Sequence, residues 1–252
     1  SNTAIGTFAL NLNTASNNTA VGYNALRCST TASNNVAVGR CTLFANTIDN
    51  TTAVGALALW CNTSGTGNSA FGTSALRNNT TGNNNTAVGE SALTSSSTGN
   101  ANTALGRWAG FNCTGSNNIF IGHQSGNLNT TGCDHVFIGT YAGQSATGAS
   151  YSNFLGTPTG INAINANNSN FIGGGAGDSA IDANNSNFMG QLAGYEATNA
   201  YQSNFIGQQT GYQAPNAYQS NFMGYYAGFR ATNASNSNFL GIFISSNLKY
   251  QF

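Results

Sequence analysis

Glycine recurs along this chain at an almost constant spacing of 16 or 17 residues. The fifteen members of the series are Gly6, Gly22, Gly39, Gly55, Gly72, Gly89, Gly106, Gly122, Gly139, Gly156, Gly173, Gly190, Gly207, Gly224 and Gly241. Self-similarity at a fixed period is the signature of stacked supersecondary units that bury their apolar side chains against one another. A repeat this short cannot hold two packed helices, and the apolar residues show no helical period. We therefore predict an all-β chain, a parallel β-solenoid of about 15 coils with 16–17-residue repeats.

Each coil can be numbered from its marker glycine, which is position zero. Position −1 is large and apolar in every coil, as in Val21 and Ile172, and position +3 is small in nearly every coil, as in Ala25 and Ala176. The remaining residues are rich in Asn, Thr, Ser and Gly, which form turns. This pattern predicts a strand of about four residues, a bend at the glycine, a second short strand from +3 and a polar return loop. The marker glycine is expected to supply a positive φ or a close backbone approach.

The repeat changes character partway along the chain. Position −2 is alanine in the first seven coils and phenylalanine in the last eight, at Phe120, Phe137, Phe154, Phe171, Phe188, Phe205, Phe222 and Phe239. Position +4 changes from leucine to glycine at nearly the same place, so −2 and +4 are predicted to share one space. We divide the chain into a solenoid of N-T-A-V-G-x-x-A-L repeats over 1–110 and one of S-N-F-I-G-x-x-A-G repeats over 111–241. Residues 242–252 break the pattern and are expected to cap the solenoid or to begin a further region.

Neighbouring residues on a strand point to opposite faces, so −1 and −2 cannot both lie inside one coil. We expect the −1 column to fill the coil interior and the phenylalanine ladder to face outward; the reversed assignment stays open. An apolar column of this length is too large to leave in contact with water, so both assignments predict a homo-oligomer. The asparagines at −3 from Asn153 to Asn238 are expected to form a ladder of side-chain amides hydrogen-bonded along the solenoid axis.

Charge is scarce in this chain. Only 5% of the residues are charged, and the net charge is zero, whereas a globular domain has about 25% charged residues. A neutral polar surface is a poor partner for nucleic acid, and no segment has the roughly 18 apolar residues that span a membrane. We therefore predict no nucleic-acid binding, no membrane insertion and an extracellular or virion-surface location. Of the five cysteines, only Cys28 and Cys61 share a repeat position, about 9.6 Å apart across two coils, so free thiols are expected.

The residues with catalytic or metal-binding chemistry are isolated. Asp178 and Asp182 are interpreted as solvated loop acids, because no third polar partner recurs beside them. His123 and the cluster at 133–135 lack a standard zinc spacing. The glycine run at 173–177 lacks the Gly-Lys-Ser/Thr ending of a phosphate loop. We therefore expect no catalytic residue, no metal site, no cofactor and no enzyme activity.

Aromatic residues at variable positions are the candidates for ligand binding. Exposed rings beside asparagine and glutamine suit a glycan, because ring faces stack on sugars and amides bind hydroxyls. The alternative is that these rings cap coil corners or pack between chains. The candidates are Trp60, Tyr195, Tyr212, Tyr225, Tyr226 and Phe229.

The motifs Asn-Thr-Ala-Ile-Gly at 2–6, Asn-Thr-Ala-Val-Gly at 18–22 and 85–89 and Asn-Ser-Ala-Phe-Gly at 68–72, each followed by x-x-Ala, resemble the head repeats of trimeric autotransporter adhesins. They are equally similar to repeats of bacteriophage tail fibres. The resemblance implies a left-handed parallel β-roll in which three chains pack around an axis, with an interwoven triple β-helix as the rival architecture.

The same resemblance implies a non-enzymatic extracellular fibre that attaches to a host cell or surface through a glycan or receptor, of either viral or bacterial origin. A purely structural shaft or self-assembling filament is the alternative. An ice-binding solenoid is disfavoured, because the threonine column at −3 is interrupted by Val36 and Ser69 and ends after the seventh coil.

Overall fold

The computed structural model describes residues 1–242, so residues 243–252 of the predicted cap lie outside the described residues. Within 1–242 the protein is all-β, without a helix. Its fifteen strands have three residues each: β1 (Thr3–Ile5), β2 (Thr19–Val21), β3 (Val36–Val38), β4 (Thr52–Val54), β5 (Ser69–Phe71), β6 (Thr86–Val88), β7 (Thr103–Leu105), β8 (Ile119–Ile121), β9 (Val136–Ile138), β10 (Asn153–Leu155), β11 (Asn170–Ile172), β12 (Asn187–Met189), β13 (Asn204–Ile206), β14 (Asn221–Met223) and β15 (Asn238–Leu240).

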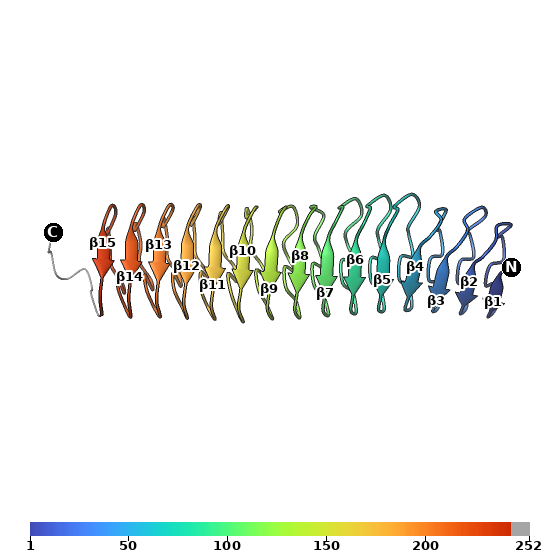
Figure 1. Ribbon diagram of the computed structural model, residues 1–252, viewed down its shortest axis with the longest axis horizontal. Coiled ribbons are helices and arrows are strands. Elements are labelled where there is room, and N and C mark those ends of the chain that lie inside the picture. The colour runs from blue at the N-terminus through green and yellow to red at the C-terminus, as the bar shows by residue number, and fades with distance from the viewer. Residues whose placement is uncertain (243–252) are drawn as a thin grey trace. The chain divides into compact units, whose positions relative to one another are not determined.

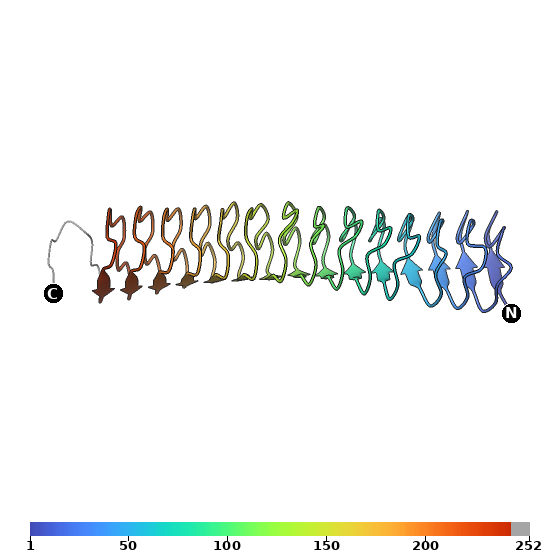
Figure 2. The same cartoon turned by 90° about the horizontal axis from the view of Figure 1, so that it is seen from above.

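The chain forms two compact units. The first, Ser1–Thr131, holds β1 to β8, and the second begins at Gly132 and holds β9 to β15. In each unit consecutive strands pair in parallel and in register, so that Ala20 faces Ala37 in the first and Phe188 faces Phe205 in the second. Figure 1 shows one strand per coil, and the view in Figure 2 shows the rest of each coil looping away from its strand. The predicted parallel β-solenoid with repeats of about 17 residues is confirmed; its handedness stays a prediction.

The expected assignment of inside and outside was wrong, and the reversed one is correct. The −2 column is buried in every coil from β2 to β14, with Ala20 and Phe188 both fully enclosed. The −1 column faces outward, as Met189 and Met223 show. Both columns are apolar, so side-chain alternation alone does not distinguish them. The remainder of the coil decides, because the residues at +3 and +4 and the polar column at −4 are buried on the same side as the −2 side chains.

The −2 phenylalanines stack face to face inside the second unit. Adjacent ring centroids from Phe137 to Phe222 are separated by 4.6 to 4.8 Å, with interplanar angles of 3° to 5°. Each ring lies over the +4 glycine of its own coil. A Cβ at Gly160, for example, would lie 2.6 Å from the ring of Phe154. The predicted sharing of space between −2 and +4 is therefore confirmed, and it occurs within a single coil.

The change of interior is staggered by one coil. Gly110 already replaces leucine at +4 in the seventh coil, where −2 is still Ala104. A Cβ at Gly110 would lie 2.6 Å from the ring of Phe120 in the following coil. The first phenylalanine thus needs space in two coils at once. This contact explains why the +4 leucine is lost one coil before the −2 phenylalanine begins.

The predicted second strand from +3 is not formed. Positions +2 and +4 both have positive φ, as in Asn24 at 57° and Leu26 at 49°, and this alternation turns the chain too sharply for a strand. Hydrogen bonds still connect successive coils here, such as that from the N–H of Leu26 to the carbonyl of Thr42 at 3.0 Å. The segment therefore continues the ladder in turn conformation.

The marker glycine needs both properties expected of it. Gly39 has a φ of 135°, and a Cβ there would lie 2.6 Å from the backbone carbonyl of Gly55 in the next coil. A side chain is excluded by conformation and by space, since coils stack with their backbones in contact at this corner. The glycine period thus records a backbone contact between coils.

Candidate binding surfaces

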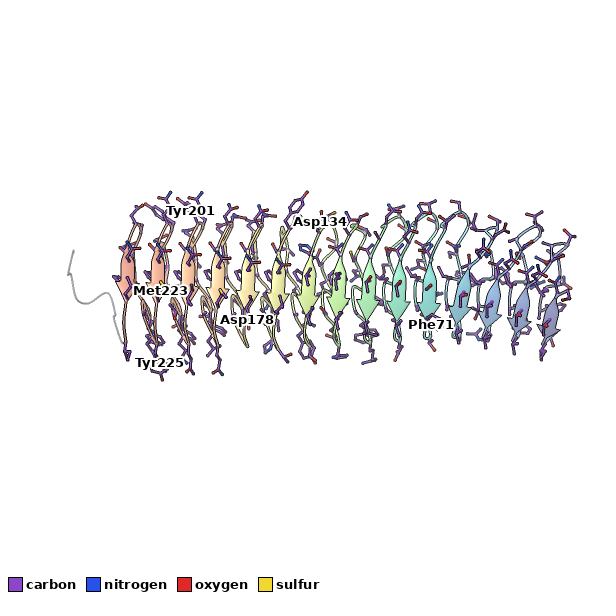
Figure 3. All side chains as sticks on the ribbon, viewed as in Figure 1. Phe71, Asp134, Asp178, Tyr201, Met223 and Tyr225 are labelled. Carbon is purple, nitrogen blue, oxygen red and sulfur yellow. The ribbon has the colours of Figure 1, made fainter. Side chains whose placement is uncertain are left out.

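The outer face of the sheet carries two columns of side chains, from positions −3 and −1. The −1 column is apolar and open to solvent, with exposed members Ile5, Phe71, Leu105, Ile138, Ile172, Met189, Ile206, Met223 and Leu240. Met223 on β14 is 42% exposed, and Figure 3 shows it on the strand itself. We call this column the apolar sheet face. It is a candidate for burial against another molecule, because contiguous apolar strips are rarely left in contact with water.

The −3 column beside it forms the predicted amide ladder in the second unit. Asn153 donates its side-chain N–H to the Asn170 oxygen at 2.8 Å, and Asn170 donates to Asn187 at 2.7 Å. The same bond repeats through Asn204 and Asn221 as far as Asn238. The ladder prediction is confirmed. Asn153 is the first rung, because Val136 occupies this position in the preceding coil.

The +5 aromatic residues of the second unit pack on one another. Tyr195 stacks on Tyr212 with centroids 5.0 Å apart, and Tyr212 stacks on Phe229 at 5.1 Å. Tyr226 contacts Phe229 at 5.1 Å, and Tyr225 meets Tyr226 edge-on at 4.3 Å. The structure therefore brings five of the six candidate aromatics together. It also covers the faces of Tyr212 with other rings, so these faces are not open to a sugar.

Polar side chains at the neighbouring +6 position hydrogen-bond to one another along the same coils. Gln213 donates an N–H to the Glu196 carboxylate at 2.7 Å, and Arg230 donates to the Gln213 oxygen at 3.0 Å. Figure 3 shows Tyr225 at one edge of the coils and Tyr201 at the opposite edge. Tyr201 stacks on Tyr218 at 5.1 Å, a second aromatic pair that the sequence patterns did not single out.

Trp60, the sixth candidate, belongs to the first unit, whereas the other five belong to the second. Its indole packs against the ring of Phe44 at 6.3 Å, and the guanidinium of Arg77 lies 5.4 Å from its centroid. Both neighbours occupy the same repeat position in the adjacent coils. Trp60 thus sits within a filled column.

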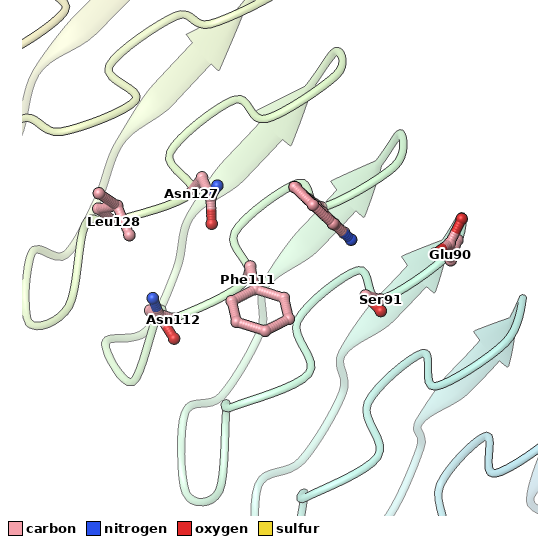
Figure 4. A pocket seen from close by; sticks show the side chains of 7 residues that line it. Glu90, Ser91, Phe111, Asn112, Asn127 and Leu128 are labelled. Atoms are coloured by element: carbon pink, nitrogen blue, oxygen red, sulfur yellow. The ribbon is translucent and has the colours of Figure 1, made fainter.

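A cleft of about 370 Å³ opens in the first unit at a place that sequence reasoning missed. Its walls include Trp108, Phe111, Glu90, Ser91, Asn112 and Asn127, which Figure 4 shows from close by. Trp108 occupies +2, a position that is not aromatic in the adjacent coils, where Ser91 and Gln124 stand. The available signal was this contrast in size between coils. The aromatic candidates chosen from the sequence did not include Trp108.

Asp182, Asp178 and His135 lie in three different surroundings. Asp182 accepts a hydrogen bond from Asn165 at 2.8 Å, whereas Asp178 is half-buried, and burial raises the pKa of its carboxyl. His135 is fully buried and stacks on Phe137 at 4.5 Å. Burial lowers the pKa of the His135 imidazole to about 4, although hydrogen bonding to the backbone of Ser152 opposes this shift.

Within residues 1–242, no three His, Cys, Asp or Glu side chains are placed to hold a metal ion. All five cysteines are free thiols. The described part of the chain also has no helix long and apolar enough to cross a membrane.

No family model and no curated protein matches this chain.

Proposed function

We propose that this chain is a non-enzymatic extracellular fibre, of the phage tail-fibre or bacterial adhesin type, that attaches to a host cell or surface. In this proposal it works as a homo-oligomer, a trimer, at the surface of a virion or cell. The observation that carries the proposal is the apolar sheet face. Within each unit the −1 side chains form an apolar column that is exposed or half-buried in every coil, on a sheet that carries no charged side chain.

A second copy of the chain is the partner that suits this face. The column has the same spacing from coil to coil in every copy, so in each unit two or three copies can cover one another's columns. The sheet also lacks charge, which removes the repulsion that identical surfaces otherwise meet. Hydrophobic burial alone can then drive the association.

Light scattering on the purified chain tests the oligomeric part of the proposal. We expect a mass near three times the 25.8 kDa chain mass. The double variant I206K/M223K places two charges on the apolar sheet face and should give monomers. A matched control, Gln208→Lys, adds charge at an exposed position off this face and should leave the trimer intact. A wild-type monomer with the apolar sheet face exposed would contradict the proposal.

Attachment is tested by measuring how much labelled protein adheres to bacterial and eukaryotic cell surfaces. The alternative is a structural shaft or self-assembling filament, which the near-equivalence of all coils favours. A trimer that adheres to selected cells supports attachment. Open-ended assemblies that adhere to no surface support the filament.

A further inference from the structure

We propose that the cleft beside Trp108 binds a neutral pyranose residue of a glycan. This proposal deepens the proposed function, since it gives the attachment fibre a ligand class and a binding site. It rests on how the side chains of three successive coils are placed around the cleft.

The cleft exists because two large residues stand beside two small ones. Trp108 and Phe111 project from one coil, at +2 and +5, and their counterparts in the preceding coil are Ser91 and Thr94. Thr94 is buried and turns its hydroxyl inward to the carbonyl of Ser74 at 2.9 Å. The two rings therefore project beyond the smaller side chains of the preceding coil and form one wall of the cleft. Its volume of about 370 Å³ falls within the range of about 300–1,000 Å³ typical of small-molecule sites.

The aromatic wall is held in place and is not covered by other rings. The guanidinium of Arg107 lies 4.1 Å from the indole centroid of Trp108 and is paired with Glu90 at 3.1 Å. The residues at the position of Phe111 in the adjacent coils are Thr94 and Asn127, so no ring stacks on Phe111 from these positions. Tyr212, by contrast, is stacked between Tyr195 and Phe229. Fixed rings with an accessible surface suit the C–H-rich face of a pyranose, since they bind apolar area at little entropic cost.

Polar groups for the sugar hydroxyls flank the two rings, with Glu90 in the preceding coil, Asn112 in the same coil and Asn127 in the following coil. The side-chain amide of Asn127 makes no hydrogen bond to any described residue, so its donor and acceptor are available. Asn112 uses its oxygen to accept from Ser95 at 3.3 Å, which orients its N–H groups. Glu90 can accept from a hydroxyl with the oxygen that does not bind Arg107. Because Glu90 and Arg107 neutralise each other, the site favours a neutral sugar over a sialylated or sulfated one.

The chain carries its own reporter for this site. It has two tryptophans, Trp60 and Trp108, so the variant W60F has Trp108 as its sole indole. We would first screen the protein on a glycan array that includes maltohexaose, cellohexaose and chitohexaose. W60F is then titrated with each neutral oligosaccharide that binds on the array. Binding should change the Trp108 fluorescence and saturate.

Two variants test the cleft from different directions. Trp108→Ala removes the indole from the wall of the cleft. Ser91→Tyr fills the space beside Trp108 with a larger side chain and keeps the indole. Tyrosine is accepted at this repeat position, since Tyr226 stands there with a similar positive φ. Each should weaken saccharide binding at least tenfold, with an unchanged circular dichroism spectrum. Trp60→Ala, which alters the other indole, should leave affinity within twofold.

The outcomes separate this proposal from the proposed function. Saccharide binding that persists in both W108A and S91Y would overturn the cleft and leave attachment standing. A protein that adheres to cells but binds no neutral saccharide on the array would overturn the cleft alone. Saccharide binding through the cleft by a protein that adheres to no surface would support the cleft and contradict attachment.

Discussion

The ring of Phe188 occupies the space that a side chain at Gly194 would need. A Cβ built on Gly194 would overlap the phenyl ring, and the same relationship holds for the −2 and +4 residues of each phenylalanine coil from Phe120 to Phe222. The coils from Ala20 to Ala87 at −2 instead bury a leucine at +4, as in Leu26. The solenoid interior is thus filled either by alanine at −2 with leucine at +4 or by phenylalanine at −2 with glycine at +4. The residues at the two positions change within one coil of each other along the chain.

Exchanging one interior for the other should show strong coupling. We expect Gly194→Leu to cost about 3 kcal/mol by overpacking and Phe188→Ala to cost about 3–5 kcal/mol by leaving a cavity. The double variant should cost less than the sum by about 1–3 kcal/mol, because the leucine at 194 fills part of the space that the phenyl ring of Phe188 leaves. Urea unfolding of the four proteins measures the coupling. Additive costs would show that −2 and +4 do not share space.

His135 should make the protein less stable in acid. Its pKa is about 4 in the folded chain and about 6.5 when unfolded. The folded state therefore binds fewer protons, and stability is complete above pH 6.5 and falls as the pH drops from there to 4. The loss is on the order of 3 kcal/mol. Thermal unfolding at pH 7 and pH 4.5 measures it.

The matched variant for this prediction is His135→Ser. Serine occupies the equivalent buried position in the following coils, as Ser152 and Ser169. We expect H135S to lose most of the difference in unfolding temperature between the two pH values. A difference that is equally large in H135S would assign the acid sensitivity to other groups.

The amide ladder should lose stability in proportion to the bonds removed. Asn187 makes two ladder bonds, to Asn170 and to Asn204, whereas Asn153 makes one. Each bond contributes about 1 kcal/mol, so Asn187→Ala should destabilise about twice as much as Asn153→Ala. The unfolding midpoints of the two variants in urea provide the comparison. Equal costs would mean that the amides act singly.

The aromatic column of the second unit should contribute to packing without contributing to binding. Tyr212→Ala removes two stacking contacts, with Tyr195 and Phe229, at a cost of about 1–3 kcal/mol. Its affinity for saccharide should match that of the wild type. Calorimetric titration with the saccharide and thermal unfolding of Y212A, beside W108A, test this division of roles. A large loss of affinity in Y212A with intact stability would assign the site to this column.

Attachment should depend little on salt. The chain has six acidic and six basic residues, so few counterions are released on binding and screening has little to act on. Adhesion measured at 50 mM and 500 mM sodium chloride should differ by less than twofold. A steep fall with salt would point to a charged patch on the protein as the binding surface.

The sequence by itself determined the coil, its period and much of its interior chemistry. The glycine spacing records a backbone contact between coils, and the asparagines at −3 hydrogen-bond as the pattern predicted. The linked change at −2 and +4 also indicated that these two positions share a space. These features were readable because each depends on one repeat position and on its copies in the neighbouring coils.

Only the tertiary structure decided which strand face is buried, and the second predicted strand failed for a related reason. A three-residue strand with apolar side chains at both −1 and −2 does not show which face will be buried. The path of the rest of the coil decides this, and that path depends on the positive φ values at +2 and +4. The Trp108 cleft was hidden for another reason. It depends on a difference in side-chain size between adjacent coils, and only the stacked structure places Trp108 beside Ser91.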